Sequence, residues 1–140
     1  MTASFGVAAA RNDAPRSMAE YALFQCVANN NLVVSAYDGV NTNNGLATGL
    51  TLPTTFQKHV IDFCTGVKTV AGGLSLGGAA STKFSIENSS GILRRVETAA
   101  PVDMSQYTGN FQFFAQLQKT AAAITAKLQI QKIIFHLREE

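Results

Sequence analysis

The C-terminal part of the chain constrains the fold most, because residues 111–140 contain no Gly, Pro, Asn or Asp. A row of mostly apolar side chains recurs there in alternating steps of three and four: Phe114, Leu117, Ala121, Ile124, Leu128, Gln131 and Phe135. This spacing is typical of one stripe along a long helix that faces a partner, as in a coiled coil. Four further apolar residues fall roughly on the opposite side of such a helix: Ile130, Ile133, Ile134 and Leu137. A terminal helix that is apolar on two sides has to pack inside its own domain or against another subunit.

The same segment also supports an interpretation as two strands. Apolar residues alternate with glutamines over 111–118 and, with one shift of phase, over 128–137. Two strands require a turn near 119–126, where the sequence K-T-A-A-A-I-T-A favours a helix and contains no turn residue. We therefore predict one long helix over 111–138, with a mostly β chain as the alternative.

Shorter patterns predict a single α+β domain over 13–140. Residues 1–12 are small and mixed in character, which predicts a flexible N-terminal arm. Caps, prolines and apolar spacing predict two short helices, over 13–28 and from 53 to about 65. Alternation and turn residues predict a small antiparallel sheet from these segments: a strand over 32–37, a weaker strand over 46–52, and a hairpin formed by 82–87 and 92–97.

Charge is scarce, and this composition favours contact between subunits. Charged residues make up 14% of the chain, whereas about 25% is usual. A polar surface with few charges costs less to desolvate, which suits packing against another subunit. The net charge of +2 is too small to indicate nucleic-acid binding. The sequence shows neither a signal-peptide pattern nor an apolar run long enough to span a membrane, so we expect synthesis in the cytoplasm, with a virion as one destination.

Few residues have the spacing that catalysis or metal binding requires. On a helix, His59 and Asp62 would be neighbours and could form an acid/base pair, but Cys64 would point away from that histidine. His136 is far from His59 in sequence and neither lies in a metal-binding motif, so we expect no metal and no cofactor. Cys26 and Cys64 fit two buried free thiols, and a disulfide between them remains an open alternative.

A Gly-rich stretch within 70–80 is the remaining candidate for binding. Its glycines are Gly72, Gly73, Gly77 and Gly78. No Gly-Lys-Ser/Thr sequence follows, so a phosphate-binding loop is disfavoured and closely packed or mobile backbone is the better interpretation. Arg94 and Arg95 are adjacent on the expected hairpin, so their side chains would face opposite sides of the strand.

Together these observations predict a non-enzymatic structural subunit that forms a homo-oligomer, for example a component of a virus or phage particle. Its partners would be copies of itself or other subunits of a larger assembly. The expected interface comprises Phe114, Leu117, Ile124, Leu128, Gln131, Phe135, Ile130, Ile134 and Leu137. The alternative is a small ligand- or peptide-binding domain that uses the Gly-rich segment 70–80. An enzyme based on His59 and Asp62 ranks last, because the chain offers few other catalytic side chains.

Overall fold

A computed structural model of the chain describes residues 2–9, 18–27, 30–64, 67–70, 74–77, 81–98, 102, 110–118 and 127–135. Within these ranges the chain forms strands and no α-helix. The strands are β1 (Thr2–Ala8), β2 (Tyr21–Cys26), β3 (Asn31–Tyr37), β4 (Thr42–Thr51), β5 (Lys58–Cys64), β6 (Val67–Val70), β7 (Leu74–Gly77), β8 (Ser81–Asn88), β9 (Gly91–Glu97) and β10 (Gln112–Gln118).

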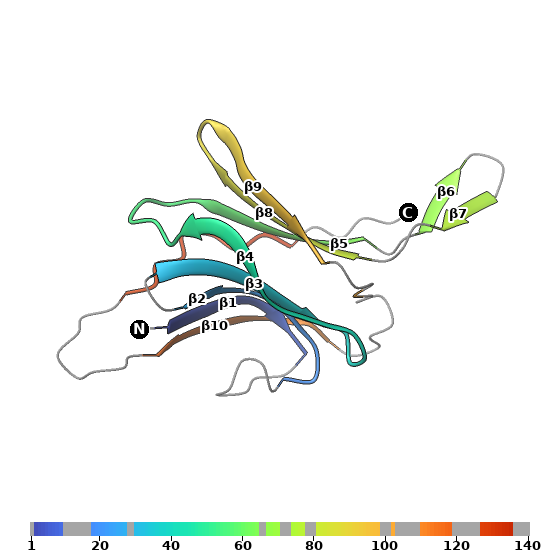
Figure 1. Cartoon of the computed structure of the whole chain (residues 1–140), viewed down its shortest axis with the longest axis horizontal. Helices are drawn as coiled ribbons and strands as arrows, with labels where there is room; N and C mark the ends of the chain where they lie inside the picture. Colours follow the sequence, from blue (N-terminus) through green and yellow to red (C-terminus); the bar gives the residue numbers. More distant parts are fainter. Residues whose placement is uncertain are drawn as a thin grey trace.

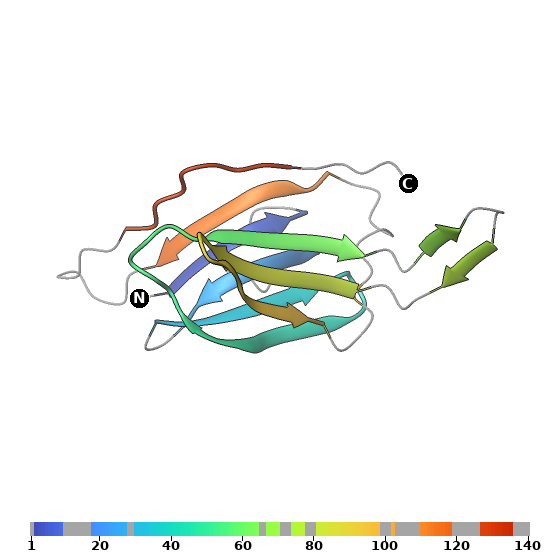
Figure 2. The same ribbon diagram turned by 90° about the horizontal axis from the view of Figure 1, so that it is seen from above.

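Two antiparallel sheets lie face to face as a β-sandwich (Figure 1). The larger sheet has five strands in the order β10-β1-β2-β3-β4, and the smaller has three in the order β5-β8-β9. Strands β6 and β7 form a separate hairpin that projects from one end of the sandwich (Figure 2). Among the described residues each sheet has two edge strands, with β10 and β5 along one side of the sandwich and β4 and β9 along the other (Figure 2).

The main core fills the space between the two sheets. Alternate residues of β2 and β3 point toward the smaller sheet, where they meet Phe84 and Ile86 of β8. The buried members of this core are Ala22, Phe24, Leu32, Val34, Ala36, Phe84, Ile86 and Val102. A sandwich of this kind is stabilised by apolar area removed from water between the layers.

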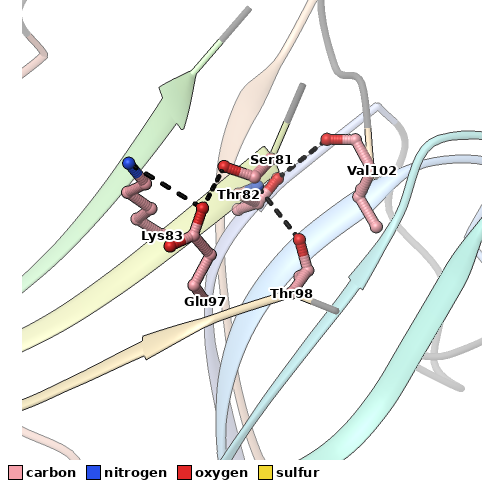
Figure 3. A network of polar contacts seen from close by, with 6 residues as sticks. All are labelled: Ser81, Thr82, Lys83, Glu97, Thr98 and Val102. Carbon is pink, nitrogen blue, oxygen red and sulfur yellow. Dashed lines mark hydrogen bonds and ion pairs between the residues drawn. The ribbon is translucent and has the colours of Figure 1, made fainter. Parts of the chain in front are cut away.

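The ends of β8 and β9 are fixed to the core by a small polar network (Figure 3). The Thr82 backbone N–H donates to Thr98 Oγ1 at 3.1 Å, and the Thr82 hydroxyl donates to the Val102 carbonyl at 3.4 Å. On the same strand, the Ser81 hydroxyl donates to Glu97 Oε1 at 2.6 Å. These bonds satisfy buried polar groups where the chain leaves β9, so Val102 is held in the core.

The strand over 32–37 and the hairpin of 82–87 with 92–97 are confirmed as β3, β8 and β9. The weaker strand over 46–52 lies largely within β4, which is longer. The strand over 32–37 is a short run rich in apolar and β-branched residues, and the hairpin combines alternation over 82–87 with turn residues over 88–91. Local pattern was therefore sufficient where it was regular.

The prediction of an α+β fold is wrong, and the structure corresponds to the mostly β alternative. Residues 21–26, expected in a helix, form β2 with six consecutive buried residues. A strand covered on both faces loses its period-two pattern and resembles a buried helix segment. Residues 58–64, also expected in a helix, form β5, in which His59 and Ile61 face the core and Asp62 faces outward.

The expected N-terminal arm and C-terminal helix are also corrected. Thr2–Ala8 is an interior strand of the larger sheet, paired with β2 on one side and β10 on the other. Part of the predicted helix 111–138 is β10, and residues 127–135 are extended rather than helical, so the coiled-coil prediction fails. Pairing with β1, more than a hundred residues away in sequence, overrides the helix propensity of this segment. No helix of membrane-spanning length and apolarity occurs in the ranges described.

Candidate assembly surface

Residues 127–135 form an extended segment on the side of the sandwich where β10 and β5 are the edges (Figure 2). The segment pairs with no strand among the described residues. Four of its side chains, Ile130, Ile133, Ile134 and Phe135, are 43% to 61% exposed. Scattered exposed apolar residues are ordinary, but four within six positions, interrupted by Gln131 and Lys132, form a local concentration of apolar side chains that favours contact with another surface.

The predicted interface residues do not form one stripe. Phe114 is buried on the outer face of the larger sheet, and Leu117 is half-buried on the opposite face of the same strand. Leu128 is half-buried and Gln131 is exposed in the extended segment. Ile124 and Leu137 lie outside the described residues. The structure therefore divides the expected interface between an edge strand and the extended segment that follows it in sequence.

Strand β10 is the outermost strand of the larger sheet among the described residues, and it carries no charged residue and no proline over Gln112–Gln118. Segment 127–135 of the same chain runs back alongside it (Figure 2). Its pairing with β1 runs without a register shift over all seven residues. A hollow of about 260 Å³ lies along Gln112, Phe113, Phe114 and Ala115. An uncharged edge strand with regular register can in general accept a further strand through its backbone N–H and C=O groups.

The other three edges each carry a feature that opposes strand addition. Strand β4 is uncharged, but its pairing with β3 has two register shifts, and Gly45 and Gly49 have positive φ. Strand β9 carries Arg94 and Arg95 and a register shift against β8. Strand β5 carries Lys58 and Asp62. Bulges and edge charges are the usual protection against edge-to-edge pairing, so β10 is the least protected edge of the two sheets.

The outer face of the smaller sheet is charged and balanced. Lys58 donates to Glu87 Oε2 at 2.9 Å, and Lys83 lies 3.8 Å from Glu97 Oε1. The hydrogen bond from Lys58 is the main cause that lowers the pKa of the Glu87 carboxyl. Paired exposed charges of this kind keep a face solvated and contribute little to stability. We regard this face as the solvent side of the sandwich.

The outer face of the larger sheet instead carries a buried polar ladder across four strands. Gln25 Nε2 donates to Ser4 Oγ at 3.3 Å, and the Ser35 hydroxyl donates to Gln25 Oε1 at 2.7 Å. The Gly45 backbone N–H donates to Ser35 Oγ at 3.0 Å. Beside this ladder lies a second apolar cluster of Ala8, Met18, Tyr21, Leu23 and Phe114. The ladder links β1 to β4 through buried hydrogen bonds, which makes this part of the sheet rigid. Strand β10 pairs with β1 and is therefore held by a rigid neighbour.

His59 is a core residue rather than part of an acid/base pair. It lies edge-on to Phe24 and Phe5, with ring centroids 4.8 Å and 5.1 Å away, and its Nε2 is buried with no hydrogen-bond partner among the described residues. Asp62 lies three residues further along the strand, on the opposite face. The proposed pair is therefore wrong, because strand geometry separates residues that a helix would bring together.

We expect the free energy of unfolding to fall as the pH is lowered from 7.5 to 5.5. Burial lowers the pKa of the His59 imidazole, and a hydrogen bond with the Gln57 backbone only partly opposes this. The unfolded chain binds this proton near pH 6.5, whereas the folded chain binds it only at lower pH. The contribution of His59 to the free energy of unfolding is therefore fully present above about pH 6.5. It decreases as the pH falls from there toward the pKa of His59 in the folded chain.

Urea unfolding followed by circular dichroism at the two pH values measures this effect. His59→Gln should flatten the dependence, whereas the control His136→Gln, which changes the other histidine, should retain it. An equal slope in all three chains would contradict the assignment to His59. The lower limit of pH 5.5 is chosen because burial, and then Asp38, raise the pKa of Glu20, whose protonation acts in the opposite direction.

The structure gives little support to the other candidate sites. Gly77 ends β7, whereas Gly72, Gly73 and Gly78 lie outside the described residues. The hairpin that contains Gly77 stands clear of both sheets, so neither sheet forms a wall opposite its described strands (Figure 1). Arg94 and Arg95 are consecutive residues of β9, opposite Ile86 and Ser85 of β8, so their side chains lie on opposite faces of the strand as predicted, and both residues are exposed.

The thiol and metal predictions fare differently. Cys26 is buried and free, and burial raises its pKa. The side chain of Cys64 lies outside the described part of the chain, so the pairing alternative is not tested. No cluster of three or more His, Cys, Asp or Glu side chains suited to a metal ion occurs in the ranges described.

The position of β10 as an uncharged edge strand of the larger sheet is the feature that sequence reasoning missed. Its signal was the alternation of apolar residues with glutamines over 111–118, together with the absence of charge. Both features are present in the sequence, but we preferred the helix interpretation over the strand alternative. The fold and its surfaces define a two-layer antiparallel β-sandwich with one uncharged edge strand of regular register and an exposed apolar segment. No family model, no curated protein and no solved structure matches this chain at a significant level.

Proposed function

We propose that this chain is a non-enzymatic structural subunit that assembles with copies of itself. The observation that carries the proposal is the extended segment 127–135, whose apolar side chains are left uncovered on the sandwich. Exposed isoleucine and phenylalanine side chains gain free energy when a partner removes them from water, about 25 cal/mol per Å² of apolar area. A component of a virus or phage particle is one form of this function.

Two further observations support a structural role over a catalytic one. His59, the best acid/base candidate in the sequence, packs against phenylalanine rings in the core and faces away from Asp62. The described residues along the hollow beside β10 are glutamine, phenylalanine and alanine, which are not acid/base or nucleophilic groups. These surfaces favour contact with protein rather than turnover of a substrate.

Light scattering of the purified chain at micromolar concentration tests the proposal. We expect a defined oligomer, and we expect Ile134→Lys to shift it to monomer because a charge would replace an exposed apolar side chain in the segment. Phe56→Lys is the matched control, since it places the same charge at an exposed apolar position outside the segment. A wild-type chain that is monomeric across the micromolar range would refute the proposal.

A further inference from the structure

We propose that segment 127–135 covers the β10 edge of its own chain and keeps that edge from pairing with a strand of another molecule. Figure 2 shows the segment running back along the side of the sandwich on which β10 is the edge strand, in the direction opposite to β10. The inference goes beyond the proposed function. It assigns a task to the way the segment lies on its own chain, whereas the proposed function concerns the side chains that the segment leaves exposed.

The four edge strands differ in the protection that their own sequences provide. Strand β5 carries Lys58 and Asp62, and β9 carries Arg94 and Arg95. Strand β4 has two register shifts against β3. Strand β10 is uncharged and pairs with β1 over seven residues without a shift. Edges are protected by charges, by bulges or by a covering part of the chain. Strand β10 lacks the first two, and the chain's own segment runs beside it (Figure 2).

The sequence of the segment explains why it lies along the edge without joining the sheet. Leu128 and Ile130 share one phase of a period-two pattern, and Ile133 and Phe135 follow in the other phase. In a straight strand the two pairs would therefore face opposite sides of the sheet. Among the described residues the segment forms no ladder with any strand, as this conflict predicts. The segment can thus occupy the space beside β10 without offering a regular edge of its own.

The segment also brings positive charge to an edge that has none. It carries Lys127 and Lys132 and no acidic residue, and both lysines are exposed. A lysine at a sheet edge opposes pairing, because an incoming strand would have to remove the ammonium group from water. In this chain the lysines lie on the covering segment and not on β10 itself.

The cover is held by little buried surface, so it can be loosened without damage to the core. Leu128 is the half-buried residue of the segment, and Ile130, at 43% exposure, is the next most covered of its apolar residues. Neither buried cluster of the described residues includes a residue of this segment. Replacing these two side chains should therefore free the segment from the edge while the sandwich remains folded.

The test uses the full chain with Leu128→Ser and Ile130→Ser combined. We expect this loosened chain to associate through β10 into open-ended β-structure that binds thioflavin T, whereas the wild type should not bind the dye. The matched control combines Ile134→Ser and Phe135→Ser, which replaces the two most exposed apolar residues of the same segment. The control should keep the cover in place and bind no dye.

A lysine on β10 itself should substitute for the lost cover. Ala115 is an exposed residue in the middle of β10, so Ala115→Lys adds the edge charge that this strand lacks. In the loosened chain it should raise the concentration at which association begins by at least about tenfold, which corresponds to about 1.4 kcal/mol. Ala47→Lys, at an exposed alanine of β4 on the other edge of the same sheet, should leave that concentration unchanged.

Circular dichroism and urea unfolding of each variant show whether the fold is retained. Association caused by unfolding would respond equally to the two lysines, so the comparison of Ala115→Lys with Ala47→Lys identifies β10 as the surface involved. The inference is overturned if the loosened chain binds no more dye than the wild type, if the control combination binds as much dye, or if Ala115→Lys fails to suppress association selectively. A wild-type monomer would instead refute the proposed function, because the dye measurement does not depend on a wild-type oligomer.

Discussion

Gly6→Ala is expected to abolish stable folding of this chain. Gly6 lies in β1, between Leu23 of β2 and Phe114 of β10, and has φ of +152°. A Cβ atom at this position would lie 2.2 Å from the Ala22 carbonyl oxygen and 3.0 Å from the Leu23 Cα atom. Both are backbone atoms of the adjacent strand, so no side-chain rotation can relieve the overlap.

The expected loss of stability in Gly6→Ala can be compared with the free energy of unfolding of a small domain. Overpacking of an interior site costs about 1–3 kcal/mol, and a backbone conformation unfavourable to L-residues adds about 1–3 kcal/mol. A small domain has about 5–15 kcal/mol in total. The overlap also separates β1 from β2 in the middle of the larger sheet, so the loss extends to the contacts of both strands. We expect insoluble or unfolded protein, measured by circular dichroism and by the soluble fraction after expression.

Gly49→Ala separates the two causes. Gly49 has φ of +75°, but a Cβ there would meet nothing within 4 Å. Only the backbone conformation is penalised, at about 1–2 kcal/mol, so this variant should fold with a modestly lower urea midpoint. If Gly6→Ala had the same midpoint as Gly49→Ala, the close approach of β1 to β2 would not be a significant constraint.

Gly6 also illustrates why the first strand could not be predicted from sequence. Thr2–Ala8 is short in large apolar residues and contains a glycine, which locally indicates a flexible arm. In the sheet the glycine is required because the neighbouring backbone comes so close. The reason for the residue lies in β2, fifteen or more positions away, and no local pattern contains that information.

The elements that were predictable are those whose pattern is complete within the segment. The hairpin of β8 and β9 has its turn at Asn88–Gly91, where the Ser90 N–H donates to Asn88 Oδ1 at 2.8 Å. Strand β10 is the opposite case, because its local pattern did not determine its structure. Its apolar spacing is compatible with a helix, but the segment forms a strand because it pairs with β1 from the other end of the chain. Non-local pairing of this kind overrides propensity.

The candidate surface was predictable in part for the same reason. The sequence shows that the segment is apolar, and the structure leaves Ile130, Ile134 and Phe135 exposed. Its extended form and the edge position of β10 depend on which strands occupy the interior of the sheet, and that order is a property of the whole chain. Helical spacing therefore grouped Phe114 with Phe135. In the fold, Phe114 lies in a buried cluster and Phe135 is exposed.

Phe24→Ala should cause the second largest loss of stability. Phe24 is 1% exposed and lies between the sheets, where it stacks on Phe5 at 5.5 Å and meets Phe84 edge-on at 5.3 Å. Its removal leaves a cavity lined by aromatic rings on rigid strands, which cannot close around it. We expect a loss of about 3–5 kcal/mol, measured by urea unfolding at pH 7.5. Phe63→Ala is the control: Phe63 is half-buried and stacks on Phe111 at 5.8 Å, so its loss should be smaller.

The same variant has a second effect that a general loss of packing would not produce. The Phe24 ring covers His59, with 4.8 Å between the ring centroids. Without it, water can reach the imidazole, so the pKa of His59 should return toward its usual value. The fall in stability between pH 7.5 and 5.5 should therefore become smaller in Phe24→Ala than in the wild type, while it remains unchanged in Phe63→Ala. If both variants kept the wild-type slope, the burial of His59 would not depend on Phe24, and the inter-sheet aromatic cluster would not be the origin of the pH dependence.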